Sequence, residues 1–161
     1  MRIGVVSDTH NHLKNTLRIV ELLNEAGVER VVHTGDITQA KTLHAMSGLR
    51  APLYGVYGNN DLERESLARA SRELDIHLVD PPLRLSWAGR SIVVVHDPLD
   101  LAPDLLDGVD LAIHGHDHRH RSERRNGALL FNPGECAGHV PGLNQVGVVD
   151  LVRLETHVLR F

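Results

Sequence analysis

The order of the apolar segments along the chain constrains the fold more than any other feature of the sequence. In the first half, short apolar runs rich in β-branched residues alternate with segments whose apolar residues recur at helical spacing. The expected strands are residues 3–6, 28–33 and 53–57, and the expected helices are residues 13–23, 38–46 and 62–74. Gly27 supplies a stop for the first helix. This strand and helix alternation predicts an α/β fold.

The second half of the chain has a different pattern, in which short apolar runs follow one another without helical segments. These expected strands are residues 76–79, 83–87, 91–95, 109–113, 128–131, 146–152 and 156–161. Turn sequences separate several of them, including Pro81-Pro82 and Asn126-Gly127. Together the two halves predict a mixed α/β sandwich of two face-to-face sheets with helices outside.

Length and composition indicate one ordinary globular domain spanning residues 1–161. The chain has 161 residues, 42% of them hydrophobic and 24% charged, which excludes disordered, collagen-like and coiled-coil classes. The formal net charge is −4, and aromatic residues make up 3% of the chain, so bulk nucleic-acid binding is not expected. No apolar run approaches the length of a membrane span or a signal-peptide core, and a lone Cys136 fits a reducing compartment. We therefore expect a cytoplasmic protein without membrane association.

Polar residues of the types that bind metal ions follow five of the expected strands. These residues are Asp8, His10, Asp36, Asn59, His96, His116 and His118. The chain contains 12 histidines, and four of them fall within residues 114–120. Ligands of open α/β sheets bind beyond the carboxyl ends of the strands, so these five loops are expected to form one site.

Two Asp, one Asn and four His form a mixed oxygen and nitrogen donor set that suits borderline divalent ions rather than Ca²⁺. Mn²⁺ is the preferred candidate, with Ni²⁺, Fe²⁺ and Zn²⁺ as alternatives. The set is too large for one tetrahedral zinc, but it suits two ions if one carboxylate, expected to be Asp36, bridges them. Such a pair supplies a hydroxide nucleophile at neutral pH and polarises a phosphoryl oxygen.

The same residues form a series of short motifs between residue 2 and about residue 150. The motifs are Asp8-Thr9-His10, Gly35-Asp36, Gly58-Asn59-Asn60-Asp61, His96, Gly115-His116-Asp117-His118 and Asn132-Pro133-Gly134. In this order they resemble the signature of the calcineurin-like metallophosphoesterase family, and their short spacing resembles its small single-domain phosphodiesterase branch.

This resemblance implies a four-layer αββα sandwich and two metal sites. It places Asp8, His10, Asp36 and His118 on the first ion, and Asp36, Asn59, His96 and His116 on the second. It also implies in-line attack on a phosphodiester by a hydroxide that bridges the metals, with Asn59 and Asn60 as candidates to steady the charge of the phosphoryl group. Asp61 matches the motif residue that orients a neighbouring group, and we include it with Asn59 and Asn60 among the candidate catalytic residues.

Two positions depart from the family pattern. Asn60 stands where the family often has a histidine that protonates the leaving oxygen, and an amide cannot be a general acid. The small branch often lacks this histidine too. Asp97 stands where the family usually has a glycine, so a carboxylate can narrow the cleft or repel a dianion. The first departure favours activated diesters or substrates that bring their own proton donor, and the second favours a diester monoanion over a monoester.

Other polar residues have ordinary interpretations. We expect a buried, hydrogen-bonded His33 and a small loop-filling role for Cys136. His12, His120 and His139 are expected at solvated loop positions, with a place on the rim in contact with substrate as the alternative. The arginine-rich stretch 119–125 is expected to form a solvated hairpin around Asn126-Gly127, with a phosphate-binding rim as the alternative.

Two other functions are compatible with the sequence. A retromer subunit is similar to this family in fold and acts as a binding module, so a non-catalytic metal-binding scaffold is one alternative. A metal-dependent hydrolase of a non-phosphate substrate is another, because it uses the same ions and nucleophile. The favoured partner is a small phosphoester substrate, with a nucleotide-like molecule as one candidate. A homo-oligomer is compatible with the sequence, which defines neither the subunit contacts nor the physiological substrate.

Overall fold

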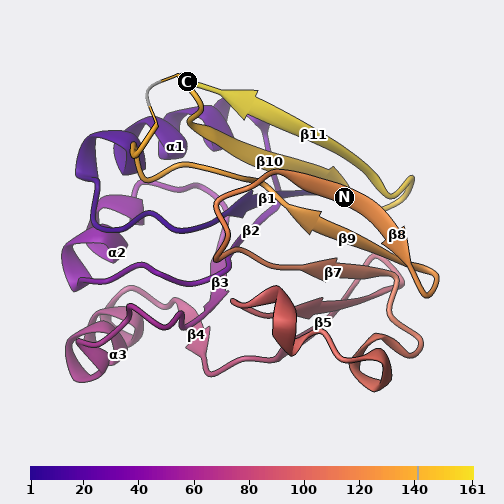
Figure 1. Ribbon diagram of the computed structural model, residues 1–161. Coiled ribbons are helices and arrows are strands. Elements are labelled where there is room, and N and C mark those ends of the chain that lie inside the picture. Colours follow the sequence, from indigo (N-terminus) through magenta and orange to yellow (C-terminus); the bar gives the residue numbers. More distant parts are fainter. Residues whose placement is uncertain (141) are drawn as a thin grey trace.

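The computed structural model of the chain describes residues 1–140 and 142–161 and contains two mixed β-sheets packed face to face. Three α-helices cover the outer face of one sheet, so the predicted α/β sandwich is confirmed (Figure 1). None of the helices in the described ranges is long and apolar enough to cross a membrane.

The larger sheet has six strands, and four of them are parallel. Its order is β11 (Glu155–Arg160), β10 (Gln145–Asp150), β1 (Arg2–Val6), β2 (Arg30–His33), β3 (Leu53–Val56) and β4 (His77–Val79). Strands β1 to β4 run parallel because a helix or loop connection returns the chain to the same edge each time. The last two strands of the chain pair antiparallel to this unit, beginning with β10 beside β1.

The three α-helices follow the first three strands of this sheet, as the periodicity predicts. They are α1 (Leu13–Ala26), α2 (Ala40–Met46) and α3 (Arg64–Glu73). Helix α1 ends at Gly27, which has φ 61° and donates its N–H to the Asn24 carbonyl. Ile19, Leu23 and Leu43 pack from the helices onto Val31 of the sheet, which closes the first hydrophobic layer.

The smaller sheet has five strands, in the order β5 (Leu83–Trp87), β6 (Arg90–Val94), β7 (Leu111–Ile113), β9 (Ala128–Asn132) and β8 (Arg121–Arg125). Strands β6, β7 and β9 run parallel to one another. Strand β8 pairs with β9 across Asn126 and Gly127, whose φ angles of 51° and 86° suit a tight hairpin turn. Most of β8 is exposed, which matches the solvated hairpin expected for the arginine-rich stretch.

Apolar side chains from the facing surfaces of both sheets form the central layer of the core, among them Val5, Val32, Ile92, Ile113 and Phe131. The segment between β6 and β7 packs on the outer face of the smaller sheet and contains two short 3-10 helices, η1 (Pro98–Asp100), which buries no residue, and η2 (Pro103–Leu106). A third apolar cluster lies there, in which Leu106 packs with Val93 and Leu130. The fourth layer of the expected αββα arrangement is thus built from 3-10 turns.

Candidate metal centre

The seven predicted ligands come together at the carboxyl ends of strands from both sheets. Asp8 and His10 follow β1, Asp36 follows β2 and Asn59 follows β3 in the larger sheet. His96 follows β6, and His116 with His118 follow β7 in the smaller sheet. The site therefore lies across the join between the two sheets, where parallel strands direct their following loops to one edge.

The first group of donor atoms consists of oxygens of Asp8 and Asp36 with the Nε2 atoms of His10 and His118. The two Nε2 atoms are 3.3 Å apart. Asp8 Oδ1 lies 3.7 Å from His118 Nε2 and 3.9 Å from His10 Nε2, and Asp36 Oδ2 lies 3.4 Å from His10 Nε2. We call these four side chains the first cluster.

The second group of donor atoms lies on the other side of Asp36. Asn59 Oδ1 is 2.8 Å from His96 Nε2 and 3.1 Å from His116 Nδ1, and these two nitrogens are 3.2 Å apart. Asp36 Oδ1 is 3.5 Å from His96 Nε2. We call Asp36, Asn59, His96 and His116 the second cluster. One carboxylate thus presents a different oxygen to each cluster.

Hydrogen bonds behind the rings orient two histidines so that a lone pair faces the site. His96 donates from Nδ1 to the Thr34 carbonyl oxygen at 2.9 Å, which leaves Nε2 unprotonated in the neutral ring. His118 Nδ1 is 2.6 Å from Oε2 of Glu135, which leaves its Nε2 free in the same way. Carboxylate and carbonyl partners of this kind are typical of metal-binding histidines.

The residues of the first cluster fit a bound cation. Asp8 Oδ1 is buried and has no hydrogen-bond partner in the described part of the chain, although an unpaired buried charge is costly. Burial lowers the pKa of His10 below its ordinary value, against the attraction of Asp36 and Asp8, and so favours the neutral ring. An unpaired carboxylate oxygen facing imidazole nitrogens is an arrangement that a divalent ion stabilises.

Backbone strain is concentrated at the same residues. Five of the seven predicted ligands have a positive φ, in the left-handed region that non-glycine residues rarely adopt. Their φ angles are 52° at Asp8, 41° at His10, 58° at Asp36, 73° at His116 and 54° at His118. Strain of this kind persists where the surrounding structure enforces it, and it is common at functional sites.

Two glycines of the sequence motifs allow the loops to approach closely. A methyl group on Gly58 would collide with the Asp36 carboxylate. A methyl group on Gly115 would collide with side chains of Ser7, Thr34 and Asp8. A side chain at either position would therefore displace the Asp36 or the Asp8 carboxylate, and glycine avoids this collision.

Asp61 lies behind the site, where it connects two of the ligand loops. Its carboxylate accepts hydrogen bonds from the backbone N–H groups of Asp36 at 3.0 Å, Gly58 at 2.6 Å and Thr38 at 2.6 Å. The side chain is 2% exposed, and burial raises its pKa although these three bonds act in the opposite direction. This geometry supports a positioning role, because Asp61 reaches the reacting groups through Asp36.

Residues 1–154 match the family described as the calcineurin-like phosphoesterase superfamily domain. The chain belongs to this superfamily. Its sequence is 31% identical to phosphodiesterase MJ0936 of Methanocaldococcus jannaschii, over 96% of each chain. It is 26% identical to phosphodiesterase YfcE of Escherichia coli, over 85% of this chain and 80% of the relative. A solved structure described as a novel archaeal phosphodiesterase superposes with a TM-score of 0.88 at 28% identity and covers 100% of both chains.

Glu135 lies beside the first cluster and was missed by the sequence analysis. It follows β9 and is 5% exposed. Burial alone would raise its pKa, but hydrogen bonds from His118 and from the His139 backbone N–H prevail and lower it. Glutamate is rarely buried unless it is paired. A Glu in the loop after an apolar strand was therefore the sequence signal for a buried, hydrogen-bonded carboxylate.

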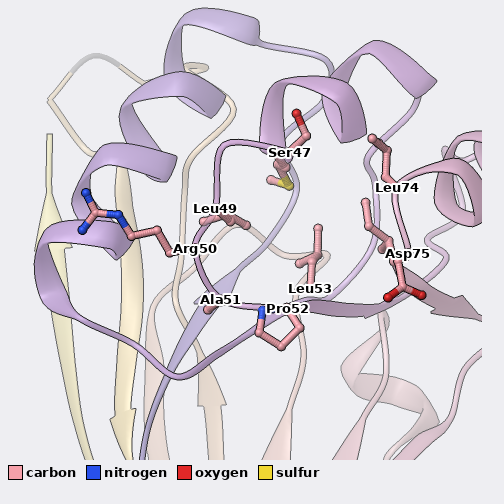
Figure 2. Close-up of a pocket in the computed structure, with 10 residues that line it drawn as sticks. Ser47, Leu49, Arg50, Ala51, Pro52, Leu53, Leu74 and Asp75 are labelled. Atoms are coloured by element: carbon pink, nitrogen blue, oxygen red, sulfur yellow. The ribbon is translucent and has the colours of Figure 1, made fainter.

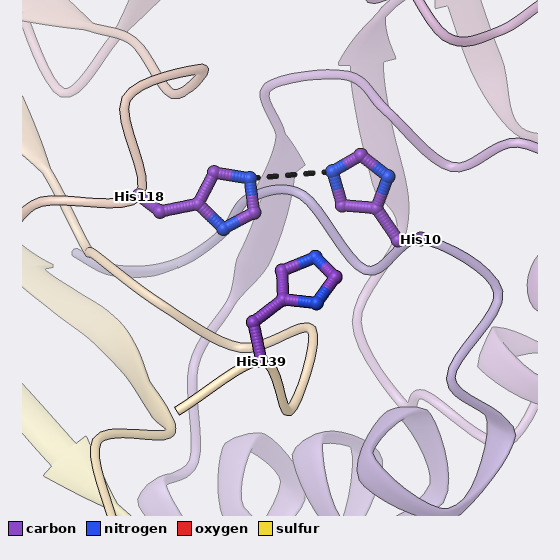
Figure 3. A group of neighbouring side chains, drawn as sticks. All are labelled: His10, His118 and His139. Carbon is purple, nitrogen blue, oxygen red and sulfur yellow. Dashed lines mark hydrogen bonds between the residues drawn. The ribbon is translucent and has the colours of Figure 1, made fainter. Parts of the chain in front are cut away.

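His139 is an exposed loop residue, as the sequence analysis expected, and its ring also lies beside the first cluster. Its ring centroid is 5.5 Å from that of His10 and 5.3 Å from that of His118. Figure 3 shows the three rings gathered from three separate loops. His12 and His120 form local bonds elsewhere: His12 Nδ1 accepts the Asn15 N–H at 3.2 Å, and His120 donates to the Asn132 carbonyl at 3.0 Å.

A pocket of about 390 Å³ opens beside the second cluster. Its lining includes His96 and His116 together with Tyr57, Arg64, Pro81, Asp97 and Asp100. Asp97 Oδ2 is 3.8 Å from His116 Nε2, so the carboxylate that replaces the usual glycine lies at the site entrance. The Arg64 guanidinium lies 3.5 Å from the centre of the Tyr57 ring and pairs with Asp80.

Another pocket, of about 320 Å³, lies near the amino end of β3, away from the ligand loops (Figure 2). Most of the residues that line it are of apolar type, and Arg50 and Asp75 are its charged residues. Cys136 is buried at the edge of the first hydrophobic layer, and burial raises the pKa of its thiol well above the ordinary value. Neither feature offers a nucleophile or a set of metal ligands.

Proposed function

We propose that this phosphoesterase is a metal-dependent phosphodiesterase with a dinuclear centre. The proposal rests on the position of the Asp36 carboxylate between the two clusters. Its Oδ2 lies 3.4 Å from His10 Nε2, and its Oδ1 lies 3.5 Å from His96 Nε2. A carboxylate placed in this way can bridge two ions. The relatives named phosphodiesterase support the same reaction class.

When bound, two divalent ions would supply a bridging hydroxide as the nucleophile and would neutralise charge on the phosphoryl oxygens. Asp8, His10 and His118 would hold the first ion and Asn59, His96 and His116 the second, with Asp36 shared. The charge of two divalent ions exceeds that of the two carboxylates, Asp8 and Asp36, so the loaded centre would be positive. It would attract a phosphate anion although the chain has a net charge of −4. Mn²⁺ remains the preferred ion, with Ni²⁺, Fe²⁺ and Zn²⁺ as alternatives.

The pocket beside the second cluster favours a diester. Asp97 and Asp100 both line it, so a dianionic monoester would approach two carboxylates, whereas a diester carries one negative charge. The one cation in the lining, Arg64, is already paired with Asp80. A volume of about 390 Å³ accommodates a small phosphoester, including one of nucleotide size.

Asn60 supplies no general acid, so the proposed enzyme depends on a good leaving group. Its side-chain amide donates to Asp36 Oδ2 at 2.7 Å, which makes it a support for the bridging carboxylate. Substrates with activated leaving groups, or with their own proton donor, are therefore expected to react fastest. Asn59 and the ions would steady the charge of the phosphoryl group.

The test is hydrolysis of an activated diester, bis(4-nitrophenyl) phosphate, by protein stripped of metal with a chelator. Mn²⁺, Ni²⁺, Zn²⁺ and Mg²⁺ are added back singly, and 4-nitrophenyl phosphate is the monoester control. We expect diester hydrolysis that requires added metal and exceeds monoester hydrolysis. Metal binding without turnover of either compound would favour the scaffold or a non-phosphate hydrolase. Faster monoester hydrolysis would overturn the argument from Asp97.

A further inference from the structure

A third imidazole, that of His139, lies beside the two histidines of the first cluster and does not belong to the four residues of that cluster. Ring nitrogens of His10, His118 and His139 all lie within 4.8 Å of one another. Figure 3 shows the three rings directed into one space, with His139 approaching from a different loop than the other two. Nitrogens that share one ion at about 2.1 Å lie closer together than this, so the three rings would have to turn inward on binding the ion.

The position of His139 is fixed by the buried residue that also orients His118. One oxygen of Glu135 receives the hydrogen bond from His118 Nδ1 at 2.6 Å, and the other receives the His139 backbone N–H at 2.7 Å. A single carboxylate thus holds a predicted ligand and the backbone of His139 in one arrangement. Bidentate use of this kind couples the two loops.

Side-chain amides hold the same loop from the other side. Asn15 Nδ2 donates to the Cys136 carbonyl at 2.9 Å and to Asn144 Oδ1 at 3.1 Å. Asn144 Oδ1 also accepts the Gly138 N–H at 3.0 Å. The backbone on the amino-terminal side of His139 is therefore anchored to helix α1, while the His139 side chain itself is exposed beside the first cluster.

We propose that His139 is a ligand of the first ion and makes that position nitrogen-rich. This inference rests on the proposed dinuclear centre. With His139, the first position has three imidazole nitrogens and oxygens of Asp8 and Asp36, whereas the second has two nitrogens and two oxygens. Imidazole favours the later divalent ions, and affinity rises from Mn²⁺ through Co²⁺ to Ni²⁺ for a given nitrogen and oxygen site. The first position therefore selects Ni²⁺ or Co²⁺ over Mn²⁺ more strongly than the second.

The test compares the wild-type protein with His139→Phe, which keeps an aromatic ring beside His10 and His118 but has no nitrogen. His157→Phe is the matched control, because His157 is an exposed histidine of β11. Calorimetric titration of metal-free protein with Ni²⁺ and, separately, with Mn²⁺ gives the affinities of both positions. Visible absorption of the Co²⁺ forms reports the ligand set without any need for turnover.

We expect His139→Phe to lower Ni²⁺ affinity at one position by at least about 10-fold, to change Mn²⁺ affinity less, and to alter the Co²⁺ spectrum. His157→Phe should leave all three unchanged. Two ions bound by His139→Phe with wild-type affinity and spectrum would overturn the role of His139 and leave the dinuclear centre intact. Failure of the wild-type protein to bind any of these ions would instead overturn the proposed function.

Discussion

Asn60 donates a hydrogen bond to each oxygen of the Asp36 carboxylate. Its backbone N–H lies 2.8 Å from Oδ1, and its side-chain Nδ2 lies 2.7 Å from Oδ2. Since Oδ1 faces the second cluster and Oδ2 faces the first, one residue sets the orientation of the carboxylate shared by both. The residue that replaces the usual acid of the family is thus a support for the bridge.

Asp36→Asn should abolish most of the activity. An amide has one oxygen and carries protons on its other end, so it cannot offer an acceptor to both clusters. We expect diester turnover at saturating metal to fall by at least about 10³-fold. The control is Asp110→Asn, which removes a carboxylate paired with Arg90 at 3.0 Å on the amino-terminal side of β7. Retention of the wild-type rate by Asp36→Asn would contradict the bridging assignment.

Asn60→His should restore the proton donor that the family often has at this position. General acid catalysis typically contributes about 10²–10⁴-fold, and it matters most for poor leaving groups. We therefore expect turnover of a phenyl or alkyl diester to rise relative to that of the nitrophenyl diester, by about 10-fold or more. Asn60→Ala removes the bond to Asp36 without supplying a proton and is the control. An equal effect of Asn60→His on both diesters would count against this explanation.

His33 should make the stability of the metal-free protein depend on pH. It is fully buried, donates from Nε2 to Thr9 Oγ1 at 3.1 Å and accepts the Gly35 N–H at Nδ1. Burial lowers its pKa to about 3. The unfolded chain binds a proton at His33 below about pH 6.5 and the folded chain does not, so stability falls as pH drops from about 6.5 toward 3.

Between pH 7.5 and pH 5 this histidine alone should remove about 2 kcal/mol of unfolding free energy. Urea unfolding in the presence of a chelator, for the wild type and for His33→Gln, gives the difference in pH dependence. His157→Gln should keep the wild-type dependence, because that ring is exposed. Nuclear magnetic resonance of the wild type should show His33 neutral at pH 5. A protonated His33 at that pH would disprove the prediction even if the variant failed to fold.

Much of the sandwich follows from local sequence periodicity. The expected strands and helices appear with boundaries shifted by one or two residues in most cases, because apolar spacing and stop residues such as Gly27 are local signals. Strand β8 was not among the expected apolar runs, since its charged residues face solvent and its place is set by pairing with β9. The 3-10 layer over the smaller sheet also has no periodic signal.

The grouping of the seven proposed ligands was predictable because each of them follows a strand, and parallel strands bring such loops to one edge. The positions of Glu135 and His139 beside the first cluster were harder to predict. They depend on the path of the loop after β9, which is held by hydrogen bonds from Asn15 to Cys136 and to Asn144, 129 residues further along the chain. Contacts over such separations leave no spacing pattern in the sequence.

The proposed ligands are divided between the two sheets, with Asp8, His10, Asp36 and Asn59 on one and His96, His116 and His118 on the other. An ion bound at either position would therefore add a link between two halves of the molecule that are otherwise held by apolar packing and by hydrogen bonds such as that from His96 to the Thr34 carbonyl. Like a disulfide, it would close a long loop of the chain, but reversibly and in proportion to the free metal concentration. The free metal concentration would then determine the stability of the contact between the two sheets as well as the activity of the protein.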